Sequence, residues 1–268
     1  AAMAAMTLDH LTGGRFILGL GASGPQVVEG WYGRPYTRPL ERTREYVEII
    51  RKIVARDEPV RHAGKQYQVP HPGGAGLGKP LKSILHPYRA DLPIYLGAEG
   101  PKNVAMTAEI ADGWFPIFLS PGSDAFYRAA LDEGFARPGA RRTRDDFEVA
   151  LALAVVPNED IEAAADAVRP TLALYIGGMG ARSMNFHYDV FARMGYEAEC
   201  AKIQEAYLAG DKRAAIAAVP TKLCEEVYLI GPMGKIKDDL EAWKRTCVTT
   251  LLVGGSPQLL ETMAKAVL

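Results

Sequence analysis

Three glycines, Gly19, Gly21 and Gly24, are the first residues in the chain whose type and spacing suggest a ligand-binding site. They follow an apolar run at residues 16–20, and Gly-x-Gly-x-x-Gly after a strand is the spacing of a dinucleotide-binding turn. Such a turn needs a helix that begins within the glycines. Here Pro25 follows directly after Gly24, and further glycine and proline residues come soon after it. They leave no stretch long enough to show the apolar spacing of a helix. The sequence therefore predicts no helix at this point and disfavours a dinucleotide-binding fold.

A second glycine-rich turn, GAEGPKN at residues 97–103, could bind a phosphate. Pro101 stands where the first helical residue should, and Gly97 and Gly100 let the backbone approach a ligand closely. The unpaired amides of the first helical turn then face outward, with Lys102 beside them, and helix starts bind anions. The same residues also suit an ordinary strand-to-helix turn, so both interpretations stay open.

A third glycine cluster, GGMG from Gly177, follows a predicted helix, and it suits either a helix C-cap or a ligand contact. His187 and Asp189 lie beyond it and could do proton chemistry. A single histidine in a polar loop is more often solvated, so we expect His187 to be a solvated side chain. Trp31 and Tyr32, near the first glycine loop, are expected to fill core space.

The bulk composition excludes several classes of function. The 268 residues carry 31 basic and 32 acidic side chains, so nothing suggests a nucleic-acid surface or an anionic membrane partner. No apolar run approaches the roughly 20 residues of a membrane-spanning helix. The three cysteines are far apart and form no metal-ligand pattern, which predicts reduced thiols, no metal site and a cytoplasmic protein.

Strand-like and helix-like segments alternate along most of the chain. Residues 92–118 place a helix between two apolar strands with only short connections, so these strands must be parallel. Residues 177–239 break the rhythm with helical material and no evident strand, which indicates an insertion. The expected strands are 16–20, 92–96, 114–118, one from 147 and one from 248; the expected helices are 40–56, 101–112, 124–135, one from 160, 235–244 and 258–267.

The opening residues are typical of the last turns of a helix. Leu8 and Leu11 continue the apolar face of Met3 and Ala4, and Gly13 closes the helix as a C-cap. Because a domain rarely begins inside a buried helix, we expect that earlier elements precede residue 1.

Five strands, each followed by a helix, predict most of an α/β barrel. A complete eight-stranded barrel takes about 250 residues or more, and the insertion uses part of this chain. We therefore expect a single domain, residues 1–268, that is an incomplete (β/α)8 TIM barrel. Roughly its first three βα units are absent, and a helical insertion at about 177–239 precedes the last strand. Ligands of such barrels bind at the carboxyl ends of the strands.

Several segments resemble those of a known family, and the match runs across the whole chain. They include LDHLTGGRFILGLGASG from Leu8, GGAGLGKPLKSILHP from Gly73, PIYLGAEGPKNVAMTAEIADGWFP from Pro93 and YIGGMGARSMNFHYD from Tyr175. With these motifs the chain resembles the luciferase-like oxidoreductases of the bacterial luciferase superfamily that use the deazaflavin coenzyme F-420. Flavin and deazaflavin members share LTGGRFxLGLG and ADGW, whereas GPKNVAMTAEIADGW and GGMG favour the deazaflavin branch.

The resemblance implies a cofactor site at two loops. In relatives the loop after the fourth barrel strand runs beside the cofactor, and the turn after the fifth meets its phosphate. Some deazaflavin dehydrogenases carry a glutamate acid where this chain has Gly24, and their other catalytic residues come from the first three units, so no catalytic residue is assigned. The implied cofactor contacts are Ala22, Ser23, Gly24, Gly97, Ala98, Glu99, Gly100, Pro101, Lys102, Asn103, Gly177 and Gly178.

These observations predict a cytoplasmic oxidoreductase that transfers a hydride between coenzyme F-420 and an unidentified small organic substrate. The resemblance also implies a homodimer, and no nucleic-acid or membrane partner is expected. Two alternatives stay open: an FMN-dependent luciferase-like monooxygenase, and a cofactor-binding protein without turnover. In either enzyme the cofactor ring carries the reactive atom, and the protein supplies placement and exclusion of water.

Overall fold

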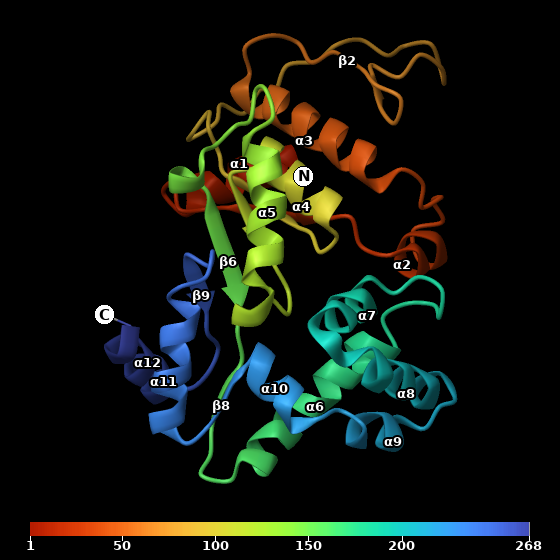
Figure 1. The fold of residues 1–268 in the computed structure, drawn as a ribbon. Helices are drawn as coiled ribbons and strands as arrows, with labels where there is room; N and C mark the ends of the chain where they lie inside the picture. Colours follow the sequence, from red (N-terminus) through yellow and green to blue (C-terminus); the bar gives the residue numbers. More distant parts are fainter. Residues whose placement is uncertain (268) are drawn as a thin grey trace. The chain divides into compact units, whose positions relative to one another are not determined.

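The computed structural model describes residues 1–267, which fall into two compact units (Figure 1). Unit 1 consists of Ala1–Ala98, Lys102–Trp114 and Leu131–Phe147. Unit 2 consists of Glu99–Pro101, Phe115–Ala130 and the chain from Glu148 onward. The predicted single domain with an insertion at about 177–239 stays a prediction.

Unit 1 is built on parallel strands. β1 (Leu18–Gly21) and β4 (Ile94–Gly97) pair in parallel from Leu18↔Ile94 to Gly21↔Gly97, and β5 (Gly113–Phe115) lies on the other side of β4. The helix α4 (Pro101–Ile110) connects β4 with β5, so the predicted strand–helix–strand unit is confirmed. Three of the four residues of β4 are buried, as a strand covered on both faces requires.

Two helices cover one face of β1 and β4. Met6 of α1 (Ala2–Leu11) and Ile50 of α3 (Pro39–Ala55) belong to the same buried apolar core as Ile94 of β4. The apolar residues of α3 recur at helical spacing, which buries one side of this helix. The predicted helix over residues 40–56 is therefore confirmed.

The prediction that Leu8 and Leu11 continue the apolar face of α1 is wrong. Leu11 is 77 % exposed and Leu8 is exposed as well, whereas Met6 and Asp9 are completely buried. Arg89 donates a 2.6 Å hydrogen bond to the Asp9 carboxylate. The buried face of α1 thus contains an ion pair, which a search for apolar periodicity does not detect.

A short helix, α2 (Pro25–Gly30), begins directly after the glycines, contrary to the prediction of no helix there. Gly24 is its N-cap residue, and Pro25 takes the first helical position, where the missing N–H of proline costs no hydrogen bond. None of the six residues of α2 is buried. Trp31 and Tyr32 follow this exposed helix and are 82 % and 67 % exposed, so the prediction that they fill core space is wrong.

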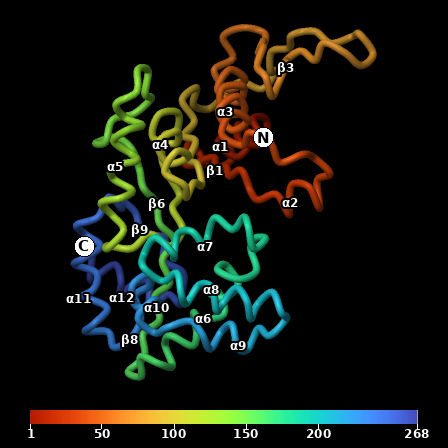
Figure 2. The backbone as a smooth tube through the Cα atoms, turned by 45° about the vertical axis from the view of Figure 1, so that its right-hand side comes forward, coloured from red at the N-terminus to blue at the C-terminus, as the bar shows by residue number. Residues whose placement is uncertain are grey.

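A small antiparallel hairpin, β2 (His62–Ala63) and β3 (Gln68–Val69), follows α3 in unit 1 (Figure 2). The Glu45 carboxylate of α3 accepts backbone N–H groups from residues 65–67 at 2.8 to 3.2 Å. Burial alone would raise the pKa of Glu45, but these N–H groups together with His62 lower it. Polar contacts therefore hold the hairpin against α3.

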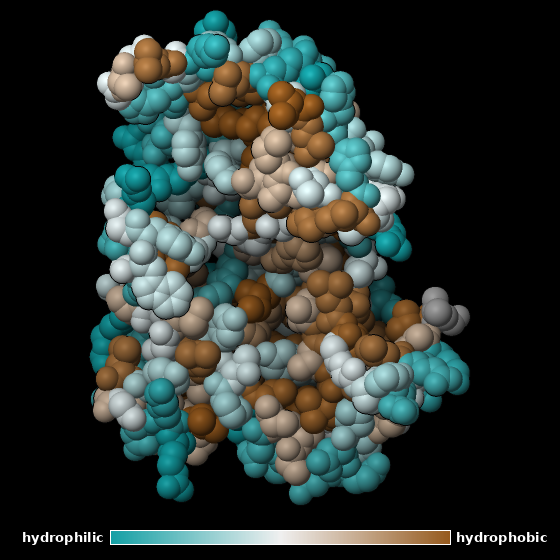
Figure 3. Space-filling model, turned by 180° about the vertical axis from the view of Figure 1, so that it is seen from behind, coloured by the Kyte–Doolittle hydropathy of each residue, from teal (hydrophilic) through white to brown (hydrophobic). Residues whose placement is uncertain are grey.

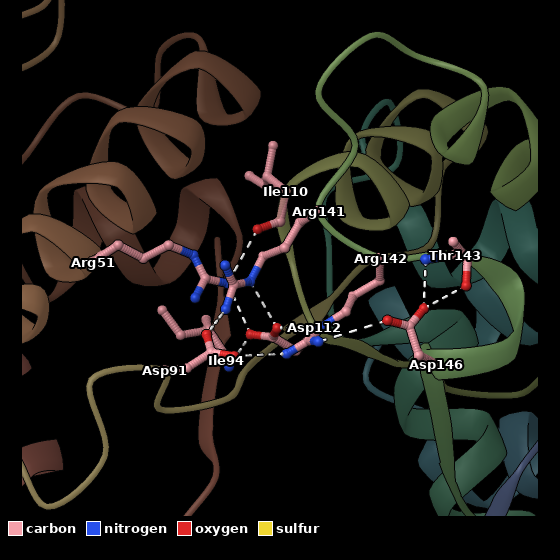
Figure 4. Close-up of polar contacts among 9 residues, drawn as sticks. All are labelled: Arg51, Asp91, Ile94, Ile110, Asp112, Arg141, Arg142, Thr143 and Asp146. Atoms are coloured by element: carbon pink, nitrogen blue, oxygen red, sulfur yellow. Dashed lines mark hydrogen bonds and ion pairs between the residues drawn. The ribbon is translucent and has the colours of Figure 1, made fainter.

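The segment ADGW, which leads into β5, anchors unit 1 (Figure 4). The buried Asp112 carboxylate accepts hydrogen bonds from the backbone N–H of Ile94 at 2.9 Å and from Arg51 at 2.8 Å. Arg141 and Arg142 donate to the same carboxylate at 2.7 and 2.8 Å. One side chain thus connects β4, α3 and the later loop that carries the two neighbouring arginines.

Three carboxylates face the three arginines of this cluster. Asp91, whose side chain is 63 % exposed, contacts both Arg141 and Arg142, and Asp146 lies 3.6 Å from Arg142. Burial foremost, then repulsion from Arg51 and Arg142, lowers the pKa of Arg141 to about 10. The acidic side chains therefore offset a repulsion that would otherwise oppose packing three guanidiniums together (Figure 4).

Unit 2 contains two parallel strand pairs. β6 (Glu148–Ala152) pairs with β9 (Thr250–Leu252), and β7 (Val155–Pro157) pairs with β8 (Leu229–Gly231). The expected strand from residue 147 is thus broken in two, and β8 lies within 177–239, where no strand was predicted. All three residues of β8 are buried, but periodicity cannot distinguish so short an apolar run from the end of a buried helix.

α6 (Ile161–Gly177) is the central helix of the helical part of unit 2 (Figure 2). The Asp160 carboxylate caps it by accepting the N–H groups of Glu162 and Ala163, and α6 packs against α8, α9 and α10. The remaining helices are α5 (Asp124–Phe135), α7 (Phe186–Phe191), α8 (Glu197–Leu208), α9 (Lys212–Ala217), α10 (Thr221–Val227), α11 (Met233–Trp243) and α12 (Pro257–Val267), with a π-helical turn at Ala192–Tyr196 and 3-10 turns at Pro121–Ser123 and Arg144–Asp146.

An apolar cavity of about 380 Å³ lies between β9, α11 and α12 in unit 2. Its lining includes Trp243, Leu251, Leu260 and Met263. Figure 3 shows apolar side chains gathered at the surface over this part of the unit. Met263 is the one buried residue of α12 among those that the structure describes.

The strands within residues 1–267 do not close into a barrel. In this range β1 pairs with β4 alone and β9 with β6 alone, so both are edge strands. Parallel strands with crossover helices confirm the α/β class, and the absence of about three βα units stays a prediction. None of the helices in the same range combines the length and the hydropathy that crossing a membrane requires.

We predict that Asp112→Asn lowers the free energy of unfolding by about 3–5 kcal/mol, because it leaves three guanidiniums without their buried partner. Urea unfolding followed by circular dichroism measures the change. Asp91→Asn is the matched control: its carboxylate is largely exposed, so its loss should cost less than about 1 kcal/mol. Equal losses for the two variants would contradict the central role of Asp112.

We also predict that Glu109 contributes to the acid sensitivity of unit 1. Its carboxylate accepts two 2.6 Å hydrogen bonds from Arg44 and one of 2.8 Å from Arg137. Arg44 foremost lowers the pKa of Glu109; burial opposes the effect and Arg137 adds to it. Stability from a lowered carboxyl pKa is complete above the unfolded value of about 4.3 and is lost as the pH falls through the folded value.

Glu109→Gln should therefore lose less stability than the parent protein between pH 5 and pH 3. Urea midpoints measured across this range test it. Glu58→Gln removes an exposed carboxylate and should leave the loss of stability between pH 5 and pH 3 unchanged. If the parent protein and Glu109→Gln lost stability equally as the pH falls from 5 to 3, Glu109 would not contribute to the acid sensitivity.

Candidate functional site

Two loops selected from the sequence leave the same edge of the unit 1 sheet. β1 and β4 run parallel, with Gly21 opposite Gly97. Residues 22–24 therefore follow one strand at the level where Ala98 follows the other. This edge is the carboxyl end of both strands, where ligands of parallel α/β sheets bind.

The open face of β1 carries no side chain near this edge. Leu18 and Leu20 pack on the core, so Gly19 and Gly21 point to the other face, and both are exposed. An ideal Cβ at Gly21 would meet no atom within 4 Å. A ligand can therefore approach the backbone of β1 directly.

A small cavity adjoins the loop after β1. Ala22 lines it with Leu20, Tyr36 and Tyr46, and its volume is about 200 Å³. The Tyr36 hydroxyl donates to the Ser23 carbonyl at 3.2 Å, and burial raises the pKa of Tyr36. Ser23 has a φ of +57°, which is uncommon outside glycine. Ligand pockets usually exceed about 300 Å³, so the cavity is too small for a cofactor, and Tyr36 serves to fix the loop.

The turn after β4 has the features of an anion site. The indole Nε1 of the buried Trp114 donates to the Ala98 carbonyl at 2.8 Å, which fixes the start of the turn. An ideal Cβ at Gly100 would meet no atom within 4 Å. α4 begins at Pro101, so its first amides are free of helical partners, and Lys102 is exposed beside them.

His187 and Glu99 form a close pair in unit 2. Nδ1 of His187 lies 2.5 Å from Oε1 of Glu99, and the two side chains are 21 % and 12 % exposed. The contact lacks the orientation of a hydrogen bond: Nδ1 of His187 and the second Glu99 oxygen, Oε2, have no hydrogen-bond partner in the described part of the chain. The prediction that His187 is a solvated side chain is therefore wrong.

Asn185 positions His187. Its Oδ1 accepts the N–H groups of His187 and Tyr188 at 3.1 Å, which caps α7. Its Nδ2 donates to the carbonyls of Tyr175 and Ile176 at 3.1 and 2.8 Å, near the end of α6. The sequence carries this signal, because asparagine is a preferred N-cap residue.

An aromatic cluster surrounds the imidazole. The His187 ring packs edge-on against Tyr175, with centroids 4.7 Å apart, and more distantly against Phe118 at 6.3 Å. Phe118, shortly after β5, is buried and has a φ of +57°. A non-glycine residue keeps this conformation only when its surroundings impose it, and such residues gather at functional sites. The cluster also includes Phe191 and Tyr228.

Gly177 and Gly178 have a packing role. A Cβ on either residue would overlap the Tyr207 side chain of α8, so glycine is required where α6 meets α8. This packing accounts for glycine at both positions without a ligand, and cofactor binding there stays a prediction. Among residues 1–267, no three His, Cys, Asp or Glu side chains gather as metal ligands would.

Comparisons with known proteins agree on one family. A family model described as luciferase-like monooxygenase matches residues 1–250. A Mycobacterium tuberculosis protein, named provisionally as a coenzyme F-420-dependent oxidoreductase, is 51 % identical over 269 residues, which cover 99 % of this chain and 78 % of that protein.

Solved structures share the fold of this chain. The coenzyme F-420-dependent tetrahydromethanopterin reductase from Methanopyrus kandleri superposes with a TM-score of 0.70 at 25 % identity, covering 96 % of this chain and 72 % of that one. An F-420-dependent secondary alcohol dehydrogenase superposes with a TM-score of 0.71 at 16 % identity, covering 98 % and 71 % of the two chains, and shows likeness of fold alone.

We predict that Trp114→Phe loosens the turn after β4. The substitution keeps an aromatic ring but leaves the Ala98 carbonyl without its donor, at a cost of about 1–3 kcal/mol. Hydrogen exchange should show faster exchange of the amides of residues 99–103, except Pro101. Trp243→Phe, a change at another buried tryptophan, should leave these amides unaffected. Unchanged exchange in Trp114→Phe would mean that the indole does not fix the turn.

Proposed function

The chain belongs to the luciferase-like monooxygenase family, and from this we propose that it is an oxidoreductase that transfers a hydride between coenzyme F-420 and a small organic substrate. The single observation that carries the proposal is the open turn at Gly100, which follows a strand of the family's parallel sheet and offers free amides to a phosphate. The F-420-dependent relatives and structures support the choice of cofactor.

The residues of the site suit a planar cofactor with a phosphate. Gly19 and Gly21 are exposed on β1, and an ideal Cβ at Gly21 would meet no atom within 4 Å, so a flat ring can approach the backbone there. Residues 22–24 and 97–103 are the contacts that we propose for the rest of the cofactor. When bound, the deazaflavin ring supplies the carbon that accepts or donates the hydride, and the protein orients it and excludes water.

We propose that backbone amides bind the phosphate more strongly than any side chain does. The amides at the start of α4 point along the helix axis, and the partial positive charge of the helix N-terminus adds to their attraction. Lys102 lies at the exposed rim of the turn, where solvent screens its charge. The lysine therefore contributes less than the amides.

An FMN-dependent monooxygenase is the second candidate, and the description of the matching family model favours it. A protein that binds the cofactor without turnover is the third. Calorimetric titration with F-420 and with FMN separates the first two. Tight binding of either cofactor without turnover on a substrate panel would favour the third.

We predict that Gly100→Val lowers the affinity for coenzyme F-420 at least about tenfold, or 1.4 kcal/mol. The valine side chain would occupy the open space that the phosphate needs, and the fold should survive because the glycine Cβ position is unobstructed and its φ suits other residues. Lys102→Ala should cost only on the order of 1 kcal/mol. Normal affinity in folded Gly100→Val would place the phosphate elsewhere.

A further inference from the structure

The cavity beside β1 is too small for a cofactor but large enough for a smaller molecule. Its volume is about 200 Å³, and an engineered apolar cavity of about 150 Å³ is enough to bind benzene. All of its lining residues belong to unit 1, so one compact unit determines its shape. A molecule with one aromatic ring and a polar substituent therefore fits the space.

Two tyrosine rings contribute to the wall of this cavity. Tyr46 of α3 and Tyr67, in the loop between β2 and β3, both line it, and their ring centroids lie 5.9 Å apart with an interplanar angle of 37°. Leu20 adds an aliphatic side chain to the lining. Within residues 1–267, neither of the two phenol hydroxyls forms a hydrogen bond. The wall therefore suits a flat apolar body and leaves hydroxyl groups free for a polar substituent.

Arg42 adds a positive charge to the same lining. It is half-buried on α3, and its guanidinium forms neither a hydrogen bond nor an ion pair with any residue that the structure describes. The other two arginines of this helix, Arg44 and Arg51, each donate to a carboxylate, at 2.6 and 2.8 Å. The fork of N–H groups on a guanidinium matches the two oxygens of a carboxylate. Arg42 is therefore available to bind a carboxylate that a ligand brings.

The acidic side chains close to Arg42 along α3 have other partners. Glu41 lies 3.5 Å from Arg38, and Glu45 accepts backbone N–H groups from the loop between β2 and β3. Burial foremost raises the pKa of the Tyr67 phenol, and the charge of Arg42 opposes this rise. The phenol thus stays protonated and able to donate, and the guanidinium acts on the wall of the cavity.

We propose that this cavity binds a small organic acid, whose carboxylate pairs with Arg42 and whose apolar body, of about one aromatic ring, packs against the two tyrosines. The inference goes beyond the proposed function, because the cavity would bind the acid with or without coenzyme F-420. Tyr36 also lines the cavity, but its hydroxyl already donates to the Ser23 carbonyl. The guanidinium is therefore the group that selects an acid over a neutral molecule.

Calorimetric titration of the parent protein with benzoate and with benzamide at pH 7 tests the inference. The two molecules are nearly equal in shape, and only benzoate carries a charge. We expect benzoate to bind at least about tenfold more tightly, because a hydrogen bond between charged groups contributes more than a neutral one. Arg42→Met should abolish this preference by weakening benzoate binding and leaving benzamide binding unchanged.

Three further variants complete the experiment. Arg213→Met removes an exposed arginine from α9 and should change neither affinity. Arg42→Gln should repeat the Arg42→Met result and replaces it if the methionine variant does not fold. Val28→Phe keeps the charge but fills part of the cavity from α2, a helix without a buried residue, so it should weaken benzoate and benzamide alike.

The affinity for coenzyme F-420 distinguishes a separate acid from the anionic groups of the cofactor. Because the cavity is too small for the cofactor, we expect Arg42→Met to bind F-420 as the parent does. A parent that binds no benzoate, together with a loss of F-420 affinity in folded Arg42→Met, would assign the guanidinium to the cofactor and overturn the inference.

Equal affinities of the parent for benzoate and benzamide would also overturn the inference, as would benzoate binding that survives the loss of the Arg42 charge. Both results would leave the proposed function standing. A parent that shows the expected preference for benzoate but binds neither F-420 nor FMN would support the acid site and contradict the proposed function.

Discussion

The Asp112 carboxylate holds the start of β4, and the same short segment of chain, ADGW, also holds the turn at the other end of that strand. The carboxylate binds the Ile94 amide and three arginines. Two residues later, Trp114 donates to the carbonyl of Ala98. The motif ADGW therefore fixes both ends of one strand, and the position of the turn depends on the ionic cluster around Asp112. An acidic residue in a family motif need not act on the substrate.

The sequence predicted the parallel strands and crossover helices of unit 1, because each is an apolar run with its own local period. It predicted the proposed turn as well, since Gly100 and Pro101 act through backbone geometry that their residue types impose. The failures have a different cause. The environment of His187 depends on Glu99, 88 positions away in the chain. The buried face of α1 likewise depends on the contact between Asp9 and Arg89. Such contacts leave no local pattern, and β8 is too short to produce one.

The candidate site relies on backbone more than on side chains. Glycine at 19, 21 and 100 leaves the strand and turn uncovered, whereas glycine at 177 and 178 serves close packing on Tyr207. One residue type therefore has two physical roles, and only the space around each Cβ position separates them.

The three tryptophans also make the protein optically informative. Trp31 is 82 % exposed, whereas Trp114 and Trp243 are 0 % and 4 % exposed. An exposed indole emits at longer wavelength than a buried one and is reached by aqueous quenchers. The long-wavelength, quenchable part of the emission therefore belongs to Trp31, near the loop after β1, and the protected part to the two buried rings. Because the indole of Trp114 is hydrogen-bonded to the Ala98 carbonyl, a change in the turn should alter the emission of this ring.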